Sequence, residues 1–216
     1  MTPNTPHSVR SNYDRLAASY AEHLFHELDN KLLDRALLDQ FAEQTAAVGP
    51  VCDMGCGPGH VARYLRDRSC NVFGLDLSPR MLDEARRLNP GIPFREGDLF
   101  ALDLAANSLA GITAFYAIVN IPAASLPQVF RELARVLAPN GLLLLAFHIG
   151  NDTIPVTELW GQPVSMDFFL FEPSAIRPQL ESAGLHIEQT IERDPYPPGV
   201  EHQTRRTYIF ARKPAL

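Results

Sequence analysis

The fold of this chain is decided by the stretch Val51-Cys52-Asp53-Met54-Gly55-Cys56-Gly57-Pro58-Gly59-His60. Val51, Cys52 and Met54 predict a short buried strand, and the glycines after them predict a tight turn that opens a helix. Because glycine has no Cβ, such a turn permits positive φ and lets the backbone approach a ligand closely. A dinucleotide-binding turn has its third glycine three residues after the second, where this chain has His60. The stretch therefore predicts a ligand site at a strand end and disfavours hydride-transfer chemistry.

Composition and charge limit the class of protein. With 216 residues, 46% of them hydrophobic, the chain can bury one substantial core, which predicts a single domain over 1–216. A formal net charge of −6 provides no attraction for nucleic acid or anionic lipid. No apolar run reaches the roughly 20 residues that a bilayer crossing needs. We therefore expect a cytoplasmic protein with a small-molecule partner and without nucleic-acid or membrane partners.

The three cysteines, Cys52, Cys56 and Cys70, are too few and too irregularly spaced for a disulfide framework, and they match no zinc pattern. His23 and His26 lie three residues apart on a predicted helix, but no carboxylate is clearly placed to complete a metal site with them. We expect reduced cysteines and no bound metal.

Helix and strand signals alternate along the chain, which predicts a doubly wound, Rossmann-like α/β fold. The expected sheet has seven mostly parallel strands, helices on both faces and an antiparallel last strand. Helices are predicted at about 8–46 (two helices), 60–68, 79–88, 125–137 and 173–183, and strands at 51–54, 71–75, 92–95, 109–117, 142–147, 185–191 and 204–212. The pattern becomes irregular over 149–172, so this insert and the helices of 8–46 are expected to form a cap over the site.

Two further acidic positions follow predicted strands. Asp76 lies 23 residues after Asp53, and Glu96-Gly97-Asp98-Leu99 follows after another 22 residues. Parallel strands bring their carboxyl ends to one edge of the sheet, where open α/β folds bind ligands. With these spacings the chain resembles the class I S-adenosylmethionine-dependent methyltransferases over almost its whole length.

The resemblance implies a role for each matching residue. Alternating glycines at 55, 57 and 59 would approach the methionine part of S-adenosylmethionine, and Asp76 would accept hydrogen bonds from the two ribose hydroxyls, since a carboxylate offers two acceptor oxygens. Asp98 would accept from the adenine amino group, with the backbone N–H of Leu99 facing the ring. In the family a Tyr-Asp-x-x-Ala-x-x-Tyr segment covers the pocket, and residues 13–20 match it, which places Tyr20 over the cofactor. The full set of predicted cofactor residues is Tyr20, Asp53, Gly55, Gly57, Gly59, Asp76, Leu77, Asp98 and Leu99.

Structural alternatives stay open for several of these residues. Asp53 can contact the cofactor, or it can hold the glycine turn through backbone N–H groups. Asp76 can be a loop acid near a helix start, and Asp98 can be an ordinary turn carboxylate.

Acceptor-side residues are less clearly indicated. His148 follows the strand at 142–147 and is a candidate general base, because a histidine at a strand's carboxyl end can titrate near neutral pH; it can equally be a strand-end residue satisfied by backbone. Asn120-Ile121-Pro122 lies where amino-methylating family members carry Asn-Pro-Pro and an aromatic residue. Ile121 and Ala123 depart from that motif, so Asn120 is a candidate acceptor contact of unspecified chemistry.

The irregular insert carries Trp160 and Phe168, which suit a pocket wall for an apolar acceptor or, alternatively, a small core beneath a long loop. Arg205 and Arg206 alternate faces on the last strand, so at most one of them can point toward the site, and Arg205 is taken as the substrate candidate.

The leading hypothesis is a methyltransferase that transfers a methyl group from S-adenosylmethionine to a small molecule. A cofactor-binding regulatory protein without turnover is the alternative from another class, and an oxidoreductase is the third.

Overall fold

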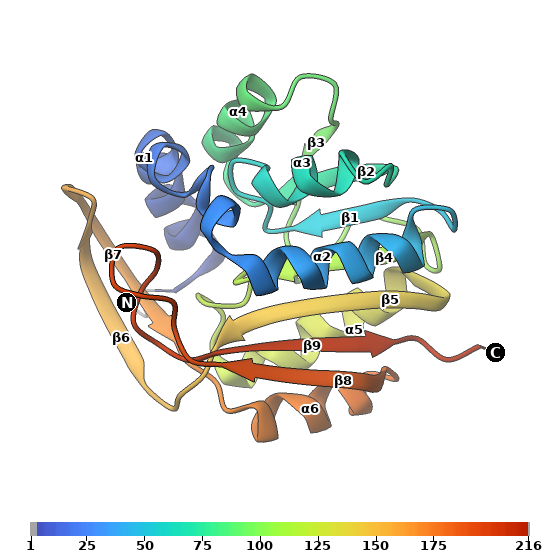
Figure 1. Ribbon diagram of the computed structural model, residues 1–216. Coiled ribbons are helices and arrows are strands. Elements are labelled where there is room, and N and C mark those ends of the chain that lie inside the picture. The colour runs from blue at the N-terminus through green and yellow to red at the C-terminus, as the bar shows by residue number, and fades with distance from the viewer. Residues whose placement is uncertain (1–3, 216) are drawn as a thin grey trace.

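Seven strands form the central sheet in the order β3-β2-β1-β4-β5-β9-β8 (Figure 1). The structure is a computed structural model that describes residues 4–215. Strands β1 to β5 run parallel to one another, whereas β9 is antiparallel to both of its neighbours. The strands are β1 (Val51–Met54), β2 (Val72–Asp76), β3 (Phe94–Glu96), β4 (Leu109–Phe115), β5 (Leu137–His148), β8 (His186–Arg193) and β9 (Arg206–Arg212). The predicted α/β fold, with its antiparallel last strand, is confirmed.

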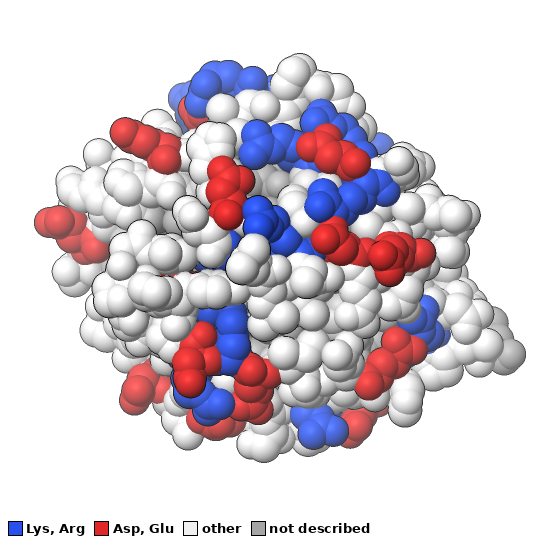
Figure 2. Space-filling model, in the orientation of Figure 1, with Lys and Arg blue, Asp and Glu red and all other residues white. Residues whose placement is uncertain are grey.

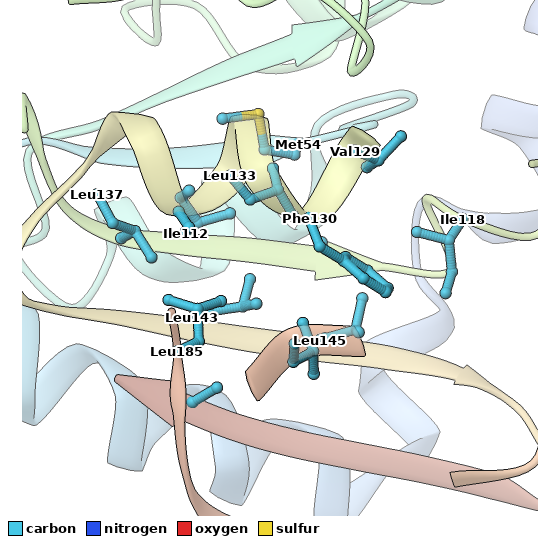
Figure 3. Packing of buried hydrophobic residues seen from close by; sticks show 14 of the residues in the cluster. Met54, Ile112, Ile118, Val129, Phe130, Leu133, Leu137, Leu143, Leu145 and Leu185 are labelled. Carbon is cyan, nitrogen blue, oxygen red and sulfur yellow. The ribbon is translucent and has the colours of Figure 1, made fainter. Parts of the chain in front are cut away.

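Helices cover both faces of this sheet, and the alternation along β5 shows why. Leu143 and Leu145 pack with helices α5 and α6 on one face (Figure 3), while Leu142 and Leu144 pack with α2, α3 and α4 on the other. Successive strand side chains point to opposite faces, so an unbroken apolar run predicts burial on both sides. The helices are α1 (Pro6–Leu24), η1 (Glu27–Asn30), α2 (Leu32–Thr45), α3 (His60–Arg66), α4 (Pro79–Leu88), η2 (Ala123–Ser125), α5 (Leu126–Val136) and α6 (Pro173–Ser182). Over residues 4–215, no helix has the length and apolar character that membrane crossing requires.

The start of α4 follows from its sequence. Ser78 is the N-cap, and its Oγ accepts a hydrogen bond from the Met81 N–H at 3.1 Å. Pro79 occupies the first helical position, where the missing N–H has no cost. This helix therefore begins directly after Asp76 and Leu77, which fixes both residues at the carboxyl end of β2.

The insert over 149–172 is not irregular, and this expectation was wrong. It contains a β-hairpin of β6 (Thr153–Leu159) and β7 (Gln162–Phe169). The turn residues Trp160 and Gly161 both have positive φ, 49° and 74°, as a two-residue type I′ turn requires. Trp-Gly is not a common sequence for such a turn, and prolines at 155 and 163 obscured the alternation of Ile154 and Val156 with polar residues.

Side chains of α1, and of Asn4 just before it, cover the outer edge of β7. Asn12 bonds both backbone groups of Ser165: its Nδ2 donates to the carbonyl at 2.9 Å, and its Oδ1 accepts from the N–H at 3.1 Å. Asn4 makes the same pair of bonds with Asp167 at 2.8 and 2.7 Å. Arg15 donates to the carbonyl of Pro163 at 2.9 Å. The hairpin and α1 are therefore joined along their length, beside the sheet rather than within it (Figure 1).

Candidate active site

A pocket with an empty volume of about 920 Å³, which includes space open to solvent, lies at the carboxyl ends of β1, β2, β3 and β4. Seven of the predicted cofactor residues line it: Tyr20, Gly55, Gly57, Asp76, Leu77, Asp98 and Leu99. Asp53 and Gly59 do not. Six of the seven lie up to 44 positions apart, from Gly55 to Leu99, and come together because they follow parallel strands; Tyr20 reaches the pocket from helix α1.

The glycines of the turn have different tasks, although all three have positive φ (66°, 51° and 81° for Gly55, Gly57 and Gly59). A Cβ on Gly55 would lie 2.8 Å from the Ala117 Cβ, and one on Gly59 would lie 2.7 Å from the Phe94 ring. A Cβ on Gly57 would meet only the Tyr20 ring, at 3.6 Å. Close packing against Ala117 and Phe94 thus requires glycine at 55 and 59. At Gly57 the missing Cβ instead leaves space in the pocket beneath the Tyr20 ring.

Asp76 is held by backbone at the edge of the pocket. Its Oδ2 accepts the Gly57 N–H and its Oδ1 accepts the Ser78 N–H, each at 2.9 Å. Burial raises the pKa of this carboxyl, and the backbone N–H groups oppose that rise. A carboxylate offers about four acceptor sites, more than the backbone N–H groups of Gly57, Leu77 and Ser78 use, so the side chain can still accept a hydrogen bond from a ligand hydroxyl.

Asp98 also accepts a backbone hydrogen bond, from the Phe100 N–H to Oδ1 at 2.9 Å. This is the turn geometry that the structural alternative predicted. Asp98 nevertheless lines the pocket, and its second oxygen has no protein partner among the hydrogen bonds of the described residues.

Asp53 supports the strands beneath the pocket. Its side chain is buried, and Oδ1 accepts a hydrogen bond from the Thr113 hydroxyl of β4 at 2.9 Å, while Oδ2 has no partner among the residues that the structure describes. Burial raises the pKa of Asp53 to about 6. Asp53 therefore has a structural role, but it differs from the expected one: among the described residues its side chain bonds Thr113 of β4 and no backbone N–H of the glycine turn.

Helix α1 closes the pocket from above. Asp14 accepts hydrogen bonds from the Ser78 hydroxyl at 2.6 Å and from the Arg80 N–H at 3.2 Å, which fixes α1 against the start of α4. Tyr13 and Tyr20 both line the pocket, with ring centroids 6.0 Å apart. Burial raises the pKa of each phenol, so both hydroxyls remain protonated at neutral pH.

Asn120 lines the pocket, but its side chain is already engaged. Its Oδ1 accepts from the Tyr13 hydroxyl at 2.8 Å, and its Nδ2 donates to the Asp167 carbonyl at 2.9 Å. The residue joins the loop after β4 to α1 and to the hairpin, so an acceptor contact would have to compete with these bonds.

His148 does not line the pocket. Its Nδ1 lies 2.7 Å from the Thr204 hydroxyl. The centroid of its ring lies 4.8 Å from the ring centroid of Tyr116, a residue that does line the pocket. Burial, together with nearby Arg206 and His202, lowers the pKa of His148 to about 3. The imidazole is therefore neutral and weakly basic at neutral pH, and the general-base role has no support in this geometry.

The other three substrate candidates also lie away from the pocket wall. Trp160 stacks on His23 of α1, with ring centroids 4.9 Å apart, and Phe168 packs against a small core around Leu16. Arg205 is half exposed and pairs with Glu192 at 3.0 Å. Its neighbour Arg206 is the inward-facing member of the pair, at 2% exposed.

A buried cluster of charges beside Tyr116 was not predicted from the sequence. Lys31 bonds Glu27 at 2.5 Å, Glu27 also bonds His60 at 2.8 Å, and Arg193 pairs with Glu201 at 2.5 Å. Asp34 and Arg206 complete the cluster. Only the four-residue spacing of Glu27 and Lys31 hinted at it in the sequence. Tyr116 itself was also missed; it lies directly after β4, with a φ of 56° that is rare for a non-glycine residue.

Comparison with known proteins now adds to this geometry. A family model described as "Methyltransferase domain" matches residues 51–141, which run from β1 into β5 and include the glycine turn, Asp76 and Asp98. This segment is a methyltransferase domain, and its glycine turn, Asp76 and Asp98 are the features by which the chain resembles the class I S-adenosylmethionine-dependent methyltransferases. The closing strands and the cap of this methyltransferase chain lie outside the matched segment.

The curated relatives are also methyltransferases by name. A malonyl-[acyl-carrier protein] O-methyltransferase of Enterobacter lignolyticus is 33% identical over 72% of this chain and 59% of that protein. A trans-aconitate 2-methyltransferase of Methylobacterium nodulans is 38% identical over 45% of this chain and 38% of that protein. This methyltransferase chain thus spans about two fifths to three fifths of the length of these relatives.

A solved structure extends the similarity to the whole fold. The DhpI–SAH complex superposes with a TM-score of 0.74 at 19% identity and covers 99% of each chain. At this level of identity the match concerns the methyltransferase fold alone.

Proposed function

We propose that this protein transfers a methyl group from S-adenosylmethionine to a small-molecule acceptor. The observation that supports the proposal is that one pocket gathers the glycine turn after β1, Asp76 after β2 and Asp98 after β3. On the face seen in Figure 2, Lys and Arg side chains lie among Asp and Glu side chains, without a field of one sign that would favour a polyanion.

The residues present fit this cofactor. The remaining acceptor capacity of Asp76 suits a ribose hydroxyl, the free oxygen of Asp98 suits the adenine amino group, and Leu77 and Leu99 provide apolar faces for the base. Gly55 and Gly57 leave room for the methionine part, with Tyr20 above them. When bound, S-adenosylmethionine supplies a methyl group already activated by its sulfonium, so the chain's own task is to bind, orient and exclude water.

Calorimetry with two glycine variants tests this proposal. Gly57→Ala and Gly91→Ala each place a Cβ on a residue of positive φ, and each should destabilise the fold by roughly 1 kcal/mol. A Cβ on Gly91 would meet only open space, and Gly91 lies away from the pocket, so it is the matched control. We expect S-adenosylmethionine and S-adenosylhomocysteine to bind the wild type and Gly91→Ala, and to bind Gly57→Ala at least about tenfold more weakly. Equal binding by the two variants, or binding of a reduced nicotinamide cofactor, would contradict the proposal.

The acceptor group that fits this pocket is a carboxylate. Titratable residues on the described pocket wall are Tyr13, Tyr20, Tyr116, Asp76 and Asp98. Burial raises the pKa of the three phenols, to about 12 for Tyr116, and both acids are assigned to the cofactor. A carboxylate is ionised at neutral pH, so it needs no base, whereas an alcohol or an ammonium group must lose a proton. The names of both relatives also specify acceptors, malonyl and trans-aconitate, that carry free carboxyl groups.

The chemical stability of the product tests the acceptor class. The protein is incubated with methyl-labelled S-adenosylmethionine and with short dicarboxylates, their thioesters, and amines and phenols of matched skeleton. A methyl ester releases volatile labelled methanol in alkali, whereas N-, S- and C-methyl products do not. Alkali-stable label would refute the carboxylate class and leave methyl transfer intact.

A regulatory protein that binds the cofactor without turnover is the alternative. It predicts saturable cofactor binding with no transferred label on any acceptor.

The three cysteines are free and buried, which supports the proposed cytoplasmic location, because reduced thiols persist in that compartment.

A further inference from the structure

Trp160 occupies an unusual place for the only tryptophan of the chain. It is the first residue of the two-residue turn between β6 and β7, with φ of 49°, although its side chain is bulky. Non-glycine residues other than Asn and Asp seldom adopt this conformation, because it crowds the Cβ against the backbone. Something must favour this side chain here over the Asn or Gly that such a turn prefers.

The contacts of the ring point toward the pocket. Trp160 stacks almost parallel on His23, at 4.9 Å and 14°, and meets the Tyr20 ring edge-on at 5.4 Å and 85°. The Nδ1 of His23 lies 2.7 Å from the Ser19 carbonyl, which can only accept, so His23 is held against its own helix. Trp160 is therefore clamped between a fixed ring and Tyr20.

Tyr20 in turn contacts the pocket floor. Its Cε1 atom lies within van der Waals distance, 3.6 Å, of the position a Cβ would take on Gly57. A ligand that packs on Gly57 from this side must touch or displace the Tyr20 ring. Because Tyr20 is bounded by Tyr13 on one side and by Trp160 on the other, that displacement reaches Trp160 directly.

We infer that Trp160 is a positioning residue, which holds Tyr20 over the glycine turn and transmits occupation of the pocket to the hairpin. This inference rests on the proposed function, since it requires that the pocket bind the cofactor. The role differs from the acceptor contact expected from the sequence, because Trp160 acts through Tyr20 and does not line the pocket itself.

Intrinsic fluorescence tests the inference without turnover, because all tryptophan emission comes from this one residue. S-adenosylhomocysteine is titrated into the protein while emission is recorded, and its Kd is measured separately by calorimetry. We expect a saturable emission change with the calorimetric midpoint. The same titration of Tyr20→Leu should show binding by calorimetry with little change in emission.

The affinity of Trp160 and Phe168 variants for S-adenosylhomocysteine shows whether Trp160 positions Tyr20 or only supports the hairpin. Trp160→Ala should weaken S-adenosylhomocysteine about two- to tenfold, as the loss of one aromatic pair predicts, and Trp160→Phe should restore most of it. The matched control is Phe168→Leu, which loosens the same hairpin in the cluster around Leu16 but leaves the contact of Trp160 with Tyr20 intact. Circular dichroism confirms that each variant is folded.

The outcomes are distinct. Binding by calorimetry with unchanged emission of the wild type overturns the inference and leaves the proposed function standing, as does equal weakening by Trp160→Ala and Phe168→Leu. Absence of any S-adenosylhomocysteine binding by the wild type overturns the proposed function and this inference together.

Discussion

At the scale of single residues, the buried carboxyl of Asp53 supports the sheet and also makes the stability of the fold depend on pH. Its carboxyl is 2% exposed, has one hydrogen bond from Thr113, and carries a second oxygen without a partner in the described part of the chain. Burial penalises the charged form, which is why the pKa rises from 3.8 to about 6.

Asp53→Asn should remove a pH-dependent loss of stability. The folded pKa lies above the unfolded one, so stability is fully present below about pH 4 and falls as the pH rises through about 6, because the unfolded state releases its proton first. A shift of this size corresponds to roughly 3 kcal/mol. Relative to the wild type, the variant should therefore gain about 2 kcal/mol in free energy of unfolding between about pH 4.5 and about pH 7, since part of the loss already occurs below pH 4.5. Urea unfolding at both pH values measures this, and identical pH dependence of the two proteins would contradict it.

Among the site residues, those that follow strands could be predicted from the sequence because local signals and parallel pairing determine where they lie. Asp76 and Asp98 reach the pocket in this way. His148 also follows a strand, yet its environment depends on Arg206, His202 and Thr204 from the far end of the chain. Sequence spacing carries no information about such neighbours, so neither its distance from the pocket nor its lowered pKa was predictable.

At the scale of elements, strand and helix positions were predicted well where one periodicity dominates. The run Leu142 to Phe147 and the Ser78-Pro79 cap are examples, and both are where they were expected. The hairpin of β6 and β7 was missed because prolines interrupt it and because Trp160-Gly161 is not a typical turn sequence. Its stability comes from contacts with α1, which are tertiary.

Asn12→Ala should loosen the hairpin from α1. The change leaves the backbone N–H and carbonyl of Ser165 without their side-chain partners, which should cost about 1 to 3 kcal/mol. Hydrogen exchange should show faster exchange of the Ser165 amide. Gln40→Ala is the control, since Gln40 makes an exposed amide bond with Gln189 far from the hairpin, and it should change stability by less than about 0.5 kcal/mol. Unchanged Ser165 exchange in Asn12→Ala would show that other contacts hold the hairpin.

At the scale of the whole molecule, Glu27 joins three parts of the chain. It lies in η1 between the cap helix α1 and the body, and its carboxylate bonds Lys31 before α2 and His60 at the start of α3. Although burial raises its pKa, the bonds to His60 and Lys31 outweigh that effect and lower the pKa to about 2.

Glu27→Gln should be strongly destabilising, because Lys31, with 4% of its side chain exposed, would lose its nearest carboxylate. We expect a loss of roughly 3 to 5 kcal/mol in free energy of unfolding. The control Glu96→Gln removes an ion pair with Arg10 whose side chains are 49% and 39% exposed, and it should cost less than about 1 kcal/mol. Chemical denaturation of both variants measures the difference, and equal losses would show that the buried pair adds nothing beyond a surface one.

The asparagine side chains on the outer edge of β7 limit aggregation, because they occupy backbone groups to which another chain could bind. A strand edge with open N–H and carbonyl groups is a template on which another chain can add a strand, the first step of aggregation. Asn4 and Asn12 fill that template at Asp167 and Ser165 with amides from the same molecule. A side-chain amide ends the ladder, since it has no further backbone to offer the next strand. Two asparagines thereby block strand addition along this part of β7.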